Sequence, residues 1–187
     1  MIFKRFAVIF WMLILTSGVC FAAEDENTLK AAYIGNFTQF IEWPEMNTSV
    51  FNLVIIKDDP IKNAFEEMGK TLLLKGKKIN IIQLRTHHEI SLFCNSFEKN
   101  GSIYMIYIPK SAETYIPKIV AATQNLPVVL ISETPGAAQQ GIHINFFTTT
   151  EQYLRFEINE RECLNHGLHV SSRLLKLAKI INPKENL

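Results

Sequence analysis

Residues 51–60 read Phe-Asn-Leu-Val-Ile-Ile-Lys-Asp-Asp-Pro, and this stretch decides the fold class. Its first six residues, 51–56, are apolar on both faces of an extended chain, which is typical of a strand buried inside a parallel sheet. The Asp58-Asp59-Pro60 turn follows, and Pro60 suits the first position of a helix. The stretch therefore predicts a buried strand that leads directly into a helix.

The same alternation of strand and helix continues along the chain. Further strands are predicted at 78–82, 103–108 and 127–132, and further helices within 88–99 and at 111–125. Alternating strands and helices favour a parallel sheet with helices on both faces and right-handed crossovers. A length of about 165 residues after the N-terminal leader suits one domain.

The two ends of this region have their own patterns. Apolar side chains recur every three or four residues over 28–41, which predicts a helix capped by Asn27 and ended by Trp43-Pro44. After Gly136, apolar residues alternate with polar ones at 142–146 and 154–158. This alternation predicts a β-hairpin with one solvated face, on which Arg155 and Glu157 point outward.

A leucine stripe then predicts one long helix from about 159 to 181. The fold class that we expect is a single-domain α/β protein. It has a mostly parallel central sheet flanked by helices, a C-terminal β-hairpin and a long terminal helix.

The N-terminus has the order of a secretory signal peptide. Lys4 and Arg5 precede an apolar run, small residues follow at 17–23, and the run is too short to span a membrane. We expect residues 1–23 to be a signal peptide, cleaved after Ala22 or Ala23, and residues 24–187 to form the domain. The alternative is a lipid-modified Cys20, although Val19 stands where such a site requires a small residue.

Charge and cysteine content limit the function further. The formal net charge is +1, and it becomes −1 when Lys4 and Arg5 are removed, so nothing predicts nucleic-acid binding. Cys94 and Cys163 remain after cleavage. An oxidising compartment permits a disulfide between them, and two unrelated buried thiols are the alternative.

Three candidate chemistries follow from short motifs. Residues 69–71, Gly-Lys-Thr, resemble the end of a phosphate-binding loop but follow a predicted helix and lack its first glycine. Glu162, His166 and His169 share one face of the predicted terminal helix and could bind a metal, or they form a solvated polar face. A small ligand would bind beyond the carboxyl ends of the strands, near the residues Asp58, Pro109 and Ser132.

Two segments resemble the YfiR family. Residues 30–44, KAAYIGNFTQFIEWP, are similar to its opening segment, and residues 155–159 with 167–178, RFEIN and GLHVSSRLLKLA, are similar to its closing strand and helix. The resemblance covers nearly all of the chain after the leader, and the closing segment is its most specific part. One departure is that the family's namesake has two disulfides, whereas this chain keeps only two cysteines.

The resemblance implies a periplasmic α/β protein without known enzymatic activity, catalytic residues or cofactor. The family's namesake represses an inner-membrane diguanylate cyclase through the cyclase's periplasmic region, which keeps cyclic-di-GMP and biofilm formation low. Members can form homodimers, and related domains are fused to sensor kinases. For this chain we therefore expect an inner-membrane diguanylate cyclase or sensor kinase as partner, with a soluble ligand-binding protein as the alternative. The candidate partner-binding residues are Phe40, Trp43, Arg155, Glu157 and Arg173.

Overall fold

A seven-stranded sheet forms the centre of the protein in the computed structural model, which describes residues 26–44, 48–96 and 103–181. Its strands lie in the order β3-β2-β4-β5-β6-β7-β9. They are β2 (Val50–Ile56), β3 (Lys78–Leu84), β4 (Ile103–Ile108), β5 (Val128–Ser132), β6 (Ile144–Thr148), β7 (Leu154–Ile158) and β9 (Lys179–Ile180). A second, two-stranded sheet pairs β1 (Ile41–Glu42) with β8 (His169–Val170).

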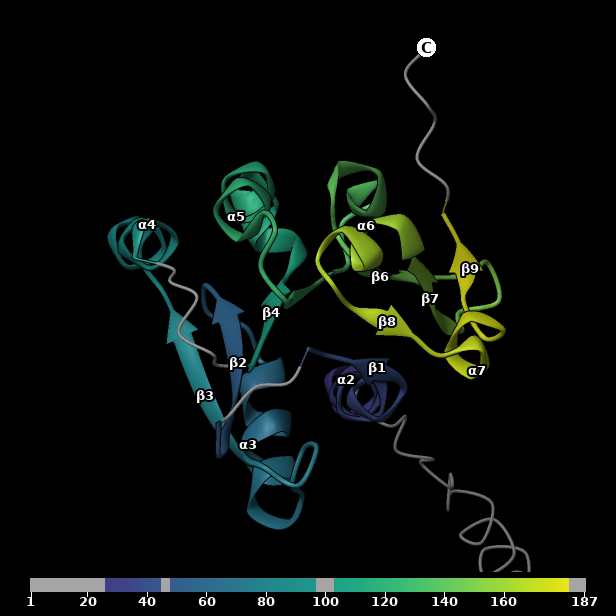
Figure 1. Ribbon diagram of the computed structural model, residues 1–187, viewed down its shortest axis with the longest axis horizontal. Helices are drawn as coiled ribbons and strands as arrows, with labels where there is room; N and C mark the ends of the chain where they lie inside the picture. The colour runs from purple at the N-terminus through teal and green to yellow at the C-terminus, as the bar shows by residue number, and fades with distance from the viewer. Residues whose placement is uncertain (1–25, 45–47, 97–102, 182–187) are drawn as a thin grey trace, which may run out of the picture.

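The helices cover both faces of the large sheet (Figure 1). On one face lie α2 (Glu26–Phe40) and α3 (Ile61–Thr71), and on the other lie α4 (His87–Asn95) and α5 (Ile116–Thr123). The remaining elements are η2 (Lys110–Tyr115), η3 (Ala137–Gln140), α6 (Glu160–Asn165) and α7 (Ser172–Leu175). None of the helices in the described ranges is long and apolar enough to cross a membrane.

Strand β2 organises the sheet, as its sequence predicts. It pairs in parallel with β3 on one side and with β4 on the other. Its alternate residues enter two separate hydrophobic clusters: Leu53 and Ile55 pack on the α2 and α3 side, and Val54 and Ile56 pack on the α4 and α5 side. Both clusters exclude water, which is why this strand has apolar residues on both faces.

The predicted fold class is confirmed: the sheet is mostly parallel, helices flank it, and β6 and β7 form an antiparallel hairpin. The helix predicted at 28–41 is α2, although Asn27 lies inside it rather than at its cap. The helix predicted at 111–125 is divided into η2 and α5. The signal peptide at 1–23, with Cys20, and the predicted helix end after Ser96 lie outside the described residues.

The prediction of one long terminal helix is wrong. Residues 159–181 form α6, β8, α7 and β9 in turn. Gly167 has a φ of +69°, a left-handed conformation that ends α6, and the Ser171 hydroxyl accepts a hydrogen bond from the Leu174 amide to start α7. The leucines of the predicted stripe consequently have different environments, since Leu168 is buried and Leu177 is 71% exposed.

The predicted solvated face of the hairpin is also wrong. Arg155 is exposed, but His143, Asn145 and Glu157 are buried. Strand β9 adds to the hairpin beyond β7 and pairs Lys179 with Glu157, and Asn145 faces Glu157 across β6 and β7. These neighbours bury the polar residues between them, so the alternation of the sequence is real but this face is solvated only toward Arg155.

Candidate functional site

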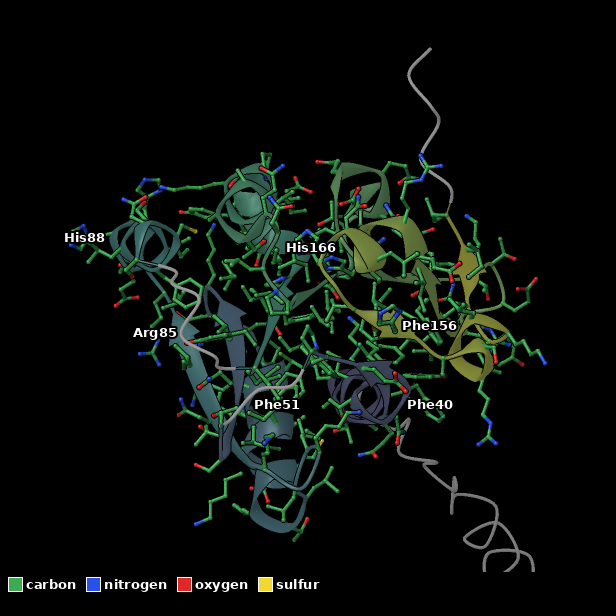
Figure 2. The ribbon with its side chains drawn as sticks, viewed as in Figure 1. Phe40, Phe51, Arg85, His88, Phe156 and His166 are labelled. Carbon is green, nitrogen blue, oxygen red and sulfur yellow. The ribbon has the colours of Figure 1, made fainter. Side chains whose placement is uncertain are left out.

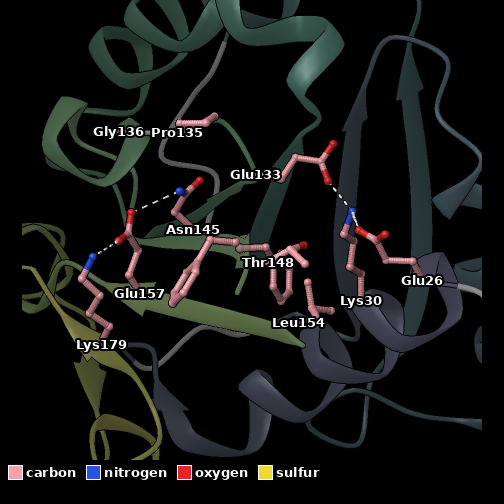
Figure 3. A pocket seen from close by; sticks show the side chains of 12 residues that line it. Glu26, Lys30, Glu133, Pro135, Gly136, Asn145, Thr148, Leu154, Glu157 and Lys179 are labelled. Atoms are coloured by element: carbon pink, nitrogen blue, oxygen red, sulfur yellow. Dashed lines mark hydrogen bonds and ion pairs between the residues drawn. The ribbon is translucent and has the colours of Figure 1, made fainter. Parts of the chain in front are cut away.

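The main candidate site is a cavity of about 430 Å³ at the carboxyl edge of the sheet, which we call the fork cavity (Figure 3). Strands β5 and β6 pair only through Ile131 with Ile144 and Ser132 with Asn145. Strand β5 then ends, whereas β6 continues to Thr148 beside β7. The cavity lies where the two strands part. Its lining residues include Glu26, Lys30, Glu133, Asn145, Phe146, Phe147, Leu154, Glu157 and Lys179.

One wall of the fork cavity carries a buried lysine. Lys30 of α2 is 7% exposed, and its Nζ lies 2.7 Å from Glu26 Oε1 and also donates to Glu133 Oε2. Glu133, which directly follows β5, accepts a further hydrogen bond from the Lys110 amide at 3.1 Å through its other oxygen. A buried charge needs this kind of pairing, because an unpaired ion in the interior is costly.

The ionisation of this wall follows from burial and pairing together. Burial alone would raise the pKa of Glu133, but the hydrogen bonds from Lys30 and the Lys110 amide outweigh it, and the pKa lies below its usual range. Burial alone would lower the pKa of Lys30, but its two glutamate partners outweigh burial and raise the pKa above its ordinary value. The pair is therefore held in its charged form.

Two further groups surround the same carboxyl edge. Tyr107 at the end of β4 is 1% exposed and hydrogen-bonds with Glu133, and burial together with the Glu133 and Asp59 charges raises its pKa. Asp59 accepts a hydrogen bond from the Ile61 amide at 3.0 Å, yet burial raises the pKa of its carboxyl. The carboxyl ends of β2, β4 and β5 thus share one set of coupled charges.

The opposite wall is a polar row across three strands. Asn145 Nδ2 donates to Glu157 Oε1 at 3.2 Å, and Lys179 Nζ lies 3.5 Å from Glu157 Oε2. Figure 3 shows Asn145 between Glu157 and Glu133. Asn145 is 1% exposed, and its Oδ1 has no hydrogen-bond partner among the described residues. Asn145, a lining residue of the fork cavity, therefore has a buried and unused acceptor beside a buried carboxylate.

The three positions predicted for a small ligand lie at this edge of the sheet but do not line the cavity. Asp58 is exposed and bonds Arg85 Nε at 2.9 Å. Pro109 precedes η2, and the Ser132 hydroxyl is buried and donates to Ile108 O at 2.9 Å. After Ser132, the next residue is the charged Glu133, which does line the cavity.

Sequence reasoning missed Lys30 and Glu133. A signal for each was present: Lys30 lies three and seven residues before Tyr33 and Phe37, on the apolar stripe of its helix, and Glu133 directly follows a buried strand. A charged residue on an apolar stripe is uncommon unless it is paired. Its partner comes from 103 residues away, so no local pattern could identify it.

The two segments that carry the family resemblance lie side by side. Strand β1 pairs with β8 through Ile41 with Val170 and Glu42 with His169, and the Ser171 amide donates to Phe40 O at 2.8 Å. Figure 2 labels Phe40 at the end of α2. Phe40 and Trp43 are both half-buried against the core, and the Trp43 ring packs edge-on to Phe51 with centroids 5.7 Å apart. The backbone pairing of β1 with β8 therefore connects the two segments, and the two aromatics pack on the core beside it.

The predicted arginines lie at one edge of the sheet, on β7 and α7. Arg155 and Arg173 are both exposed. The Arg155 guanidinium lies 5.9 Å from the ring centroid of Tyr153, which is 61% exposed, and Leu177 is 71% exposed on the chain that leads into β9. We call Tyr153, Arg155, Arg173 and Leu177 the β9 edge. Glu157, the remaining candidate, is buried in the fork cavity instead.

The structure does not bring the candidate metal ligands or the two cysteines together. No group of three or more histidine, cysteine or acidic side chains that could hold a metal occurs in the described part of the chain. His166 is buried with its Nδ1 2.9 Å from Leu126 O, whereas His169 is exposed. Cys94 and Cys163 are free thiols that pack in different hydrophobic clusters.

Comparison with known proteins gives a family and a fold. A family model described as YfiR/HmsC-like matches residues 27–179. Among solved structures, a conserved domain protein from Vibrio cholerae aligns with a TM-score of 0.56 and 10% identity. An ABC domain in complex with L-Trp from Streptococcus pneumonia aligns with a TM-score of 0.58 and 11% identity. Each alignment covers 83% of this chain, which spans 60% of the first protein and 62% of the second. At this identity the likeness concerns the fold alone. A search of curated proteins finds no match.

Proposed function

Because this chain belongs to the YfiR/HmsC-like family, we propose that it is a periplasmic regulatory protein that binds and represses an inner-membrane diguanylate cyclase. Export through the N-terminal leader would place it beside the cyclase's periplasmic region. Binding there would hold the cyclase in a low-activity arrangement, and a signal would release it by shifting the population. The family match over residues 27–179 is the observation that carries this proposal.

The β9 edge is the partner surface that we propose. Arginine and tyrosine are enriched at the energetic centres of protein interfaces, and here Tyr153, Arg155 and Arg173 are all exposed, as is Leu177. Truncating one such residue typically costs more than about 1 kcal/mol of binding free energy. Loss of Arg155 and Arg173 together should therefore weaken binding by about tenfold or more.

The test is a pull-down from detergent-solubilised membranes with the protein tagged at its C-terminus. We expect enrichment of a membrane diguanylate cyclase by the wild-type protein, and strong loss of that enrichment with the Arg155→Ala/Arg173→Ala variant. Arg85→Ala is the matched control, because Arg85 is an exposed arginine at the opposite edge of the sheet, beyond β3 (Figure 2). Repeated absence of any membrane partner would count against the proposal.

A second candidate function is the binding of a soluble small molecule, and the fork cavity is the observation that favours it. Ligands of parallel α/β sheets bind beyond the carboxyl ends of the strands, where this cavity lies. A ligand bound there would raise the melting temperature. A thermal-shift screen of metabolites without a single saturable hit would argue against this second function.

A further inference from the structure

The two charged ends of the fork cavity differ in how well their carboxylates are neutralised. At one end, Lys30 is buried between Glu26 and Glu133 and is fixed by both. At the other end, the Glu157 side chain is only 8% exposed, but its cationic partner Lys179 is 64% exposed and lies 3.5 Å away. An exposed lysine at that distance contributes little and exchanges readily with solvent. The Glu157 end therefore has a buried anion with a weakly held cation.

The surroundings of the Lys179 ammonium describe a site for a cation. Its Nζ lies 3.5 Å from Glu157 Oε2 and 5.6 Å from the ring centroid of Phe147. A carboxylate and the face of an aromatic ring are the two groups that stabilise an organic ammonium ion. The lining residues as a whole comprise three glutamates and two lysines, so the fork cavity favours a positively charged occupant.

Asn145 gives independent evidence of a missing partner. Its Nδ2 is used by Glu157, whereas its buried Oδ1 accepts nothing from the described residues. Buried polar atoms in native proteins are almost always hydrogen-bonded, and one that is not calls for a specific explanation. A ligand that carries N–H groups would supply the donor, since an ammonium ion has three.

We propose that the Glu157 end of the fork cavity binds the ammonium group of a small organic amine, which displaces the ammonium of Lys179. The ligand's ammonium donates to Glu157 and lies against the Phe147 ring. Its hydrocarbon part occupies the apolar remainder of the cavity, beside Phe146 and Leu154. This inference deepens the second candidate function and does not depend on a membrane partner.

Calorimetric titration of the purified protein with n-hexylammonium tests the site. We expect saturable binding with a dissociation constant of about 1 mM or tighter, as the size of the probe allows. 1-Hexanol and hexanoate, which have the same chain without the positive charge, should bind at least about tenfold more weakly. Equal binding of hexanol would overturn the ammonium assignment, although it would leave a ligand cavity and the second function in place.

Three variants distinguish this site from non-specific binding. Glu157→Gln should weaken hexylammonium binding by about tenfold, because it removes the buried charge. Lys179→Ala should strengthen binding by about threefold, because it removes the competing ammonium. Lys176→Ala, which changes an exposed lysine that does not line the cavity, should have no effect.

The change in hexylammonium affinity caused by Lys179→Ala tests the ammonium site even if Glu157→Gln fails to fold, because Lys179 is an exposed side chain. Weaker or unchanged binding in this variant overturns the proposal. So does the absence of saturable binding by both the wild type and Lys179→Ala. The pull-down of the membrane partner is unaffected by either result, so failure of this inference and failure of the regulatory function are separable.

Discussion

At the scale of single residues, His143 is a buried titratable group with a strongly lowered pKa. It is fully buried, its Nδ1 accepts a hydrogen bond from the Leu130 amide at 2.9 Å, and its ring lies 4.5 Å from that of His166. Burial, and then the neighbouring His166, lower the pKa of His143 to about 3. The folded protein therefore keeps this ring neutral, whereas the unfolded chain protonates it below its ordinary pKa of about 6.5.

This difference predicts a loss of stability in acid. Between pH 6.5 and pH 3 the unfolded state binds a proton that the folded state does not, so the free energy of unfolding falls as the pH falls, by up to about 1.4 kcal/mol per pH unit. His143→Asn keeps an acceptor for the Leu130 amide and should flatten this dependence between pH 6.5 and 4.5. Urea denaturation of both proteins measures it, and equal slopes would refute the assignment.

Gly141 gives a second prediction at this scale. Its φ is +98°, and a Cβ added there would lie 2.8 Å from Val120 Cγ1. Gly141→Ala should therefore cost both backbone strain and steric overlap, about 2–4 kcal/mol in total. Gly136→Ala is the matched control, because its φ of +78° is similar but a Cβ there would lie 3.9 Å from its nearest neighbour.

Chemical denaturation of the two glycine variants separates the two costs. The Gly136→Ala variant should lose only about 1 kcal/mol, the cost of the left-handed backbone. Equal losses in the two variants would mean that the contact with Val120 relaxes without cost.

At the scale of elements, the sequence predicts best where burial is uniform. The strand at 51–56 could be predicted because both of its faces are apolar, and it is β2. The strand predicted at 103–108 is β4. The prediction of a terminal helix was wrong because the leucines that mark the stripe, Leu164 and Leu168, and those that widen it, Leu174 and Leu177, do not share an environment. Two of them are buried and two are exposed, because the left-handed Gly167 and the cap at Ser171 divide the segment.

Asn159 joins α6, the first of the short elements that replace that helix, to η3. Its Oδ1 accepts from the Glu162 amide at 3.1 Å to cap α6, and its Nδ2 donates to Ala138 O at 2.8 Å in η3. Asn159→Ala should cost about 2–4 kcal/mol, because it loses the cap and leaves a buried carbonyl unpaired. Asn159→Ser can keep the cap alone and should lose about 1–2 kcal/mol less. Thermal or urea unfolding checks this order, and equal stability of the two variants would contradict a capping role.

At the scale of the whole molecule, the sequence predicts the architecture and the edge of the sheet where the site lies. It does not predict which residues form the site. Parallel strands place their carboxyl ends at one edge, so the turns after Ile56, Ile108 and Ser132 could be expected to meet there. The composition of the site depends on long-range packing instead. Helix α2 brings Lys30 to Glu133, and β9 brings Lys179 to Glu157. Neither of these two ion pairs leaves a periodic signal in the sequence.

We propose a regulatory function for a domain whose terminal segments meet in β1 and β8 and whose β9 edge exposes two arginines. If this is right, repression should depend on that edge and not on the opposite one. Cells that lack the protein should contain more cyclic-di-GMP, and the wild-type protein should restore the low level.

The most direct measurement is the intracellular concentration of cyclic-di-GMP in such cells complemented with Arg155→Ala/Arg173→Ala or with Arg85→Ala, each verified to be exported and folded. We predict that Arg85→Ala restores the low level and that the double variant leaves it high. A cyclic-di-GMP concentration that does not change when the protein is removed would contradict the regulatory function itself.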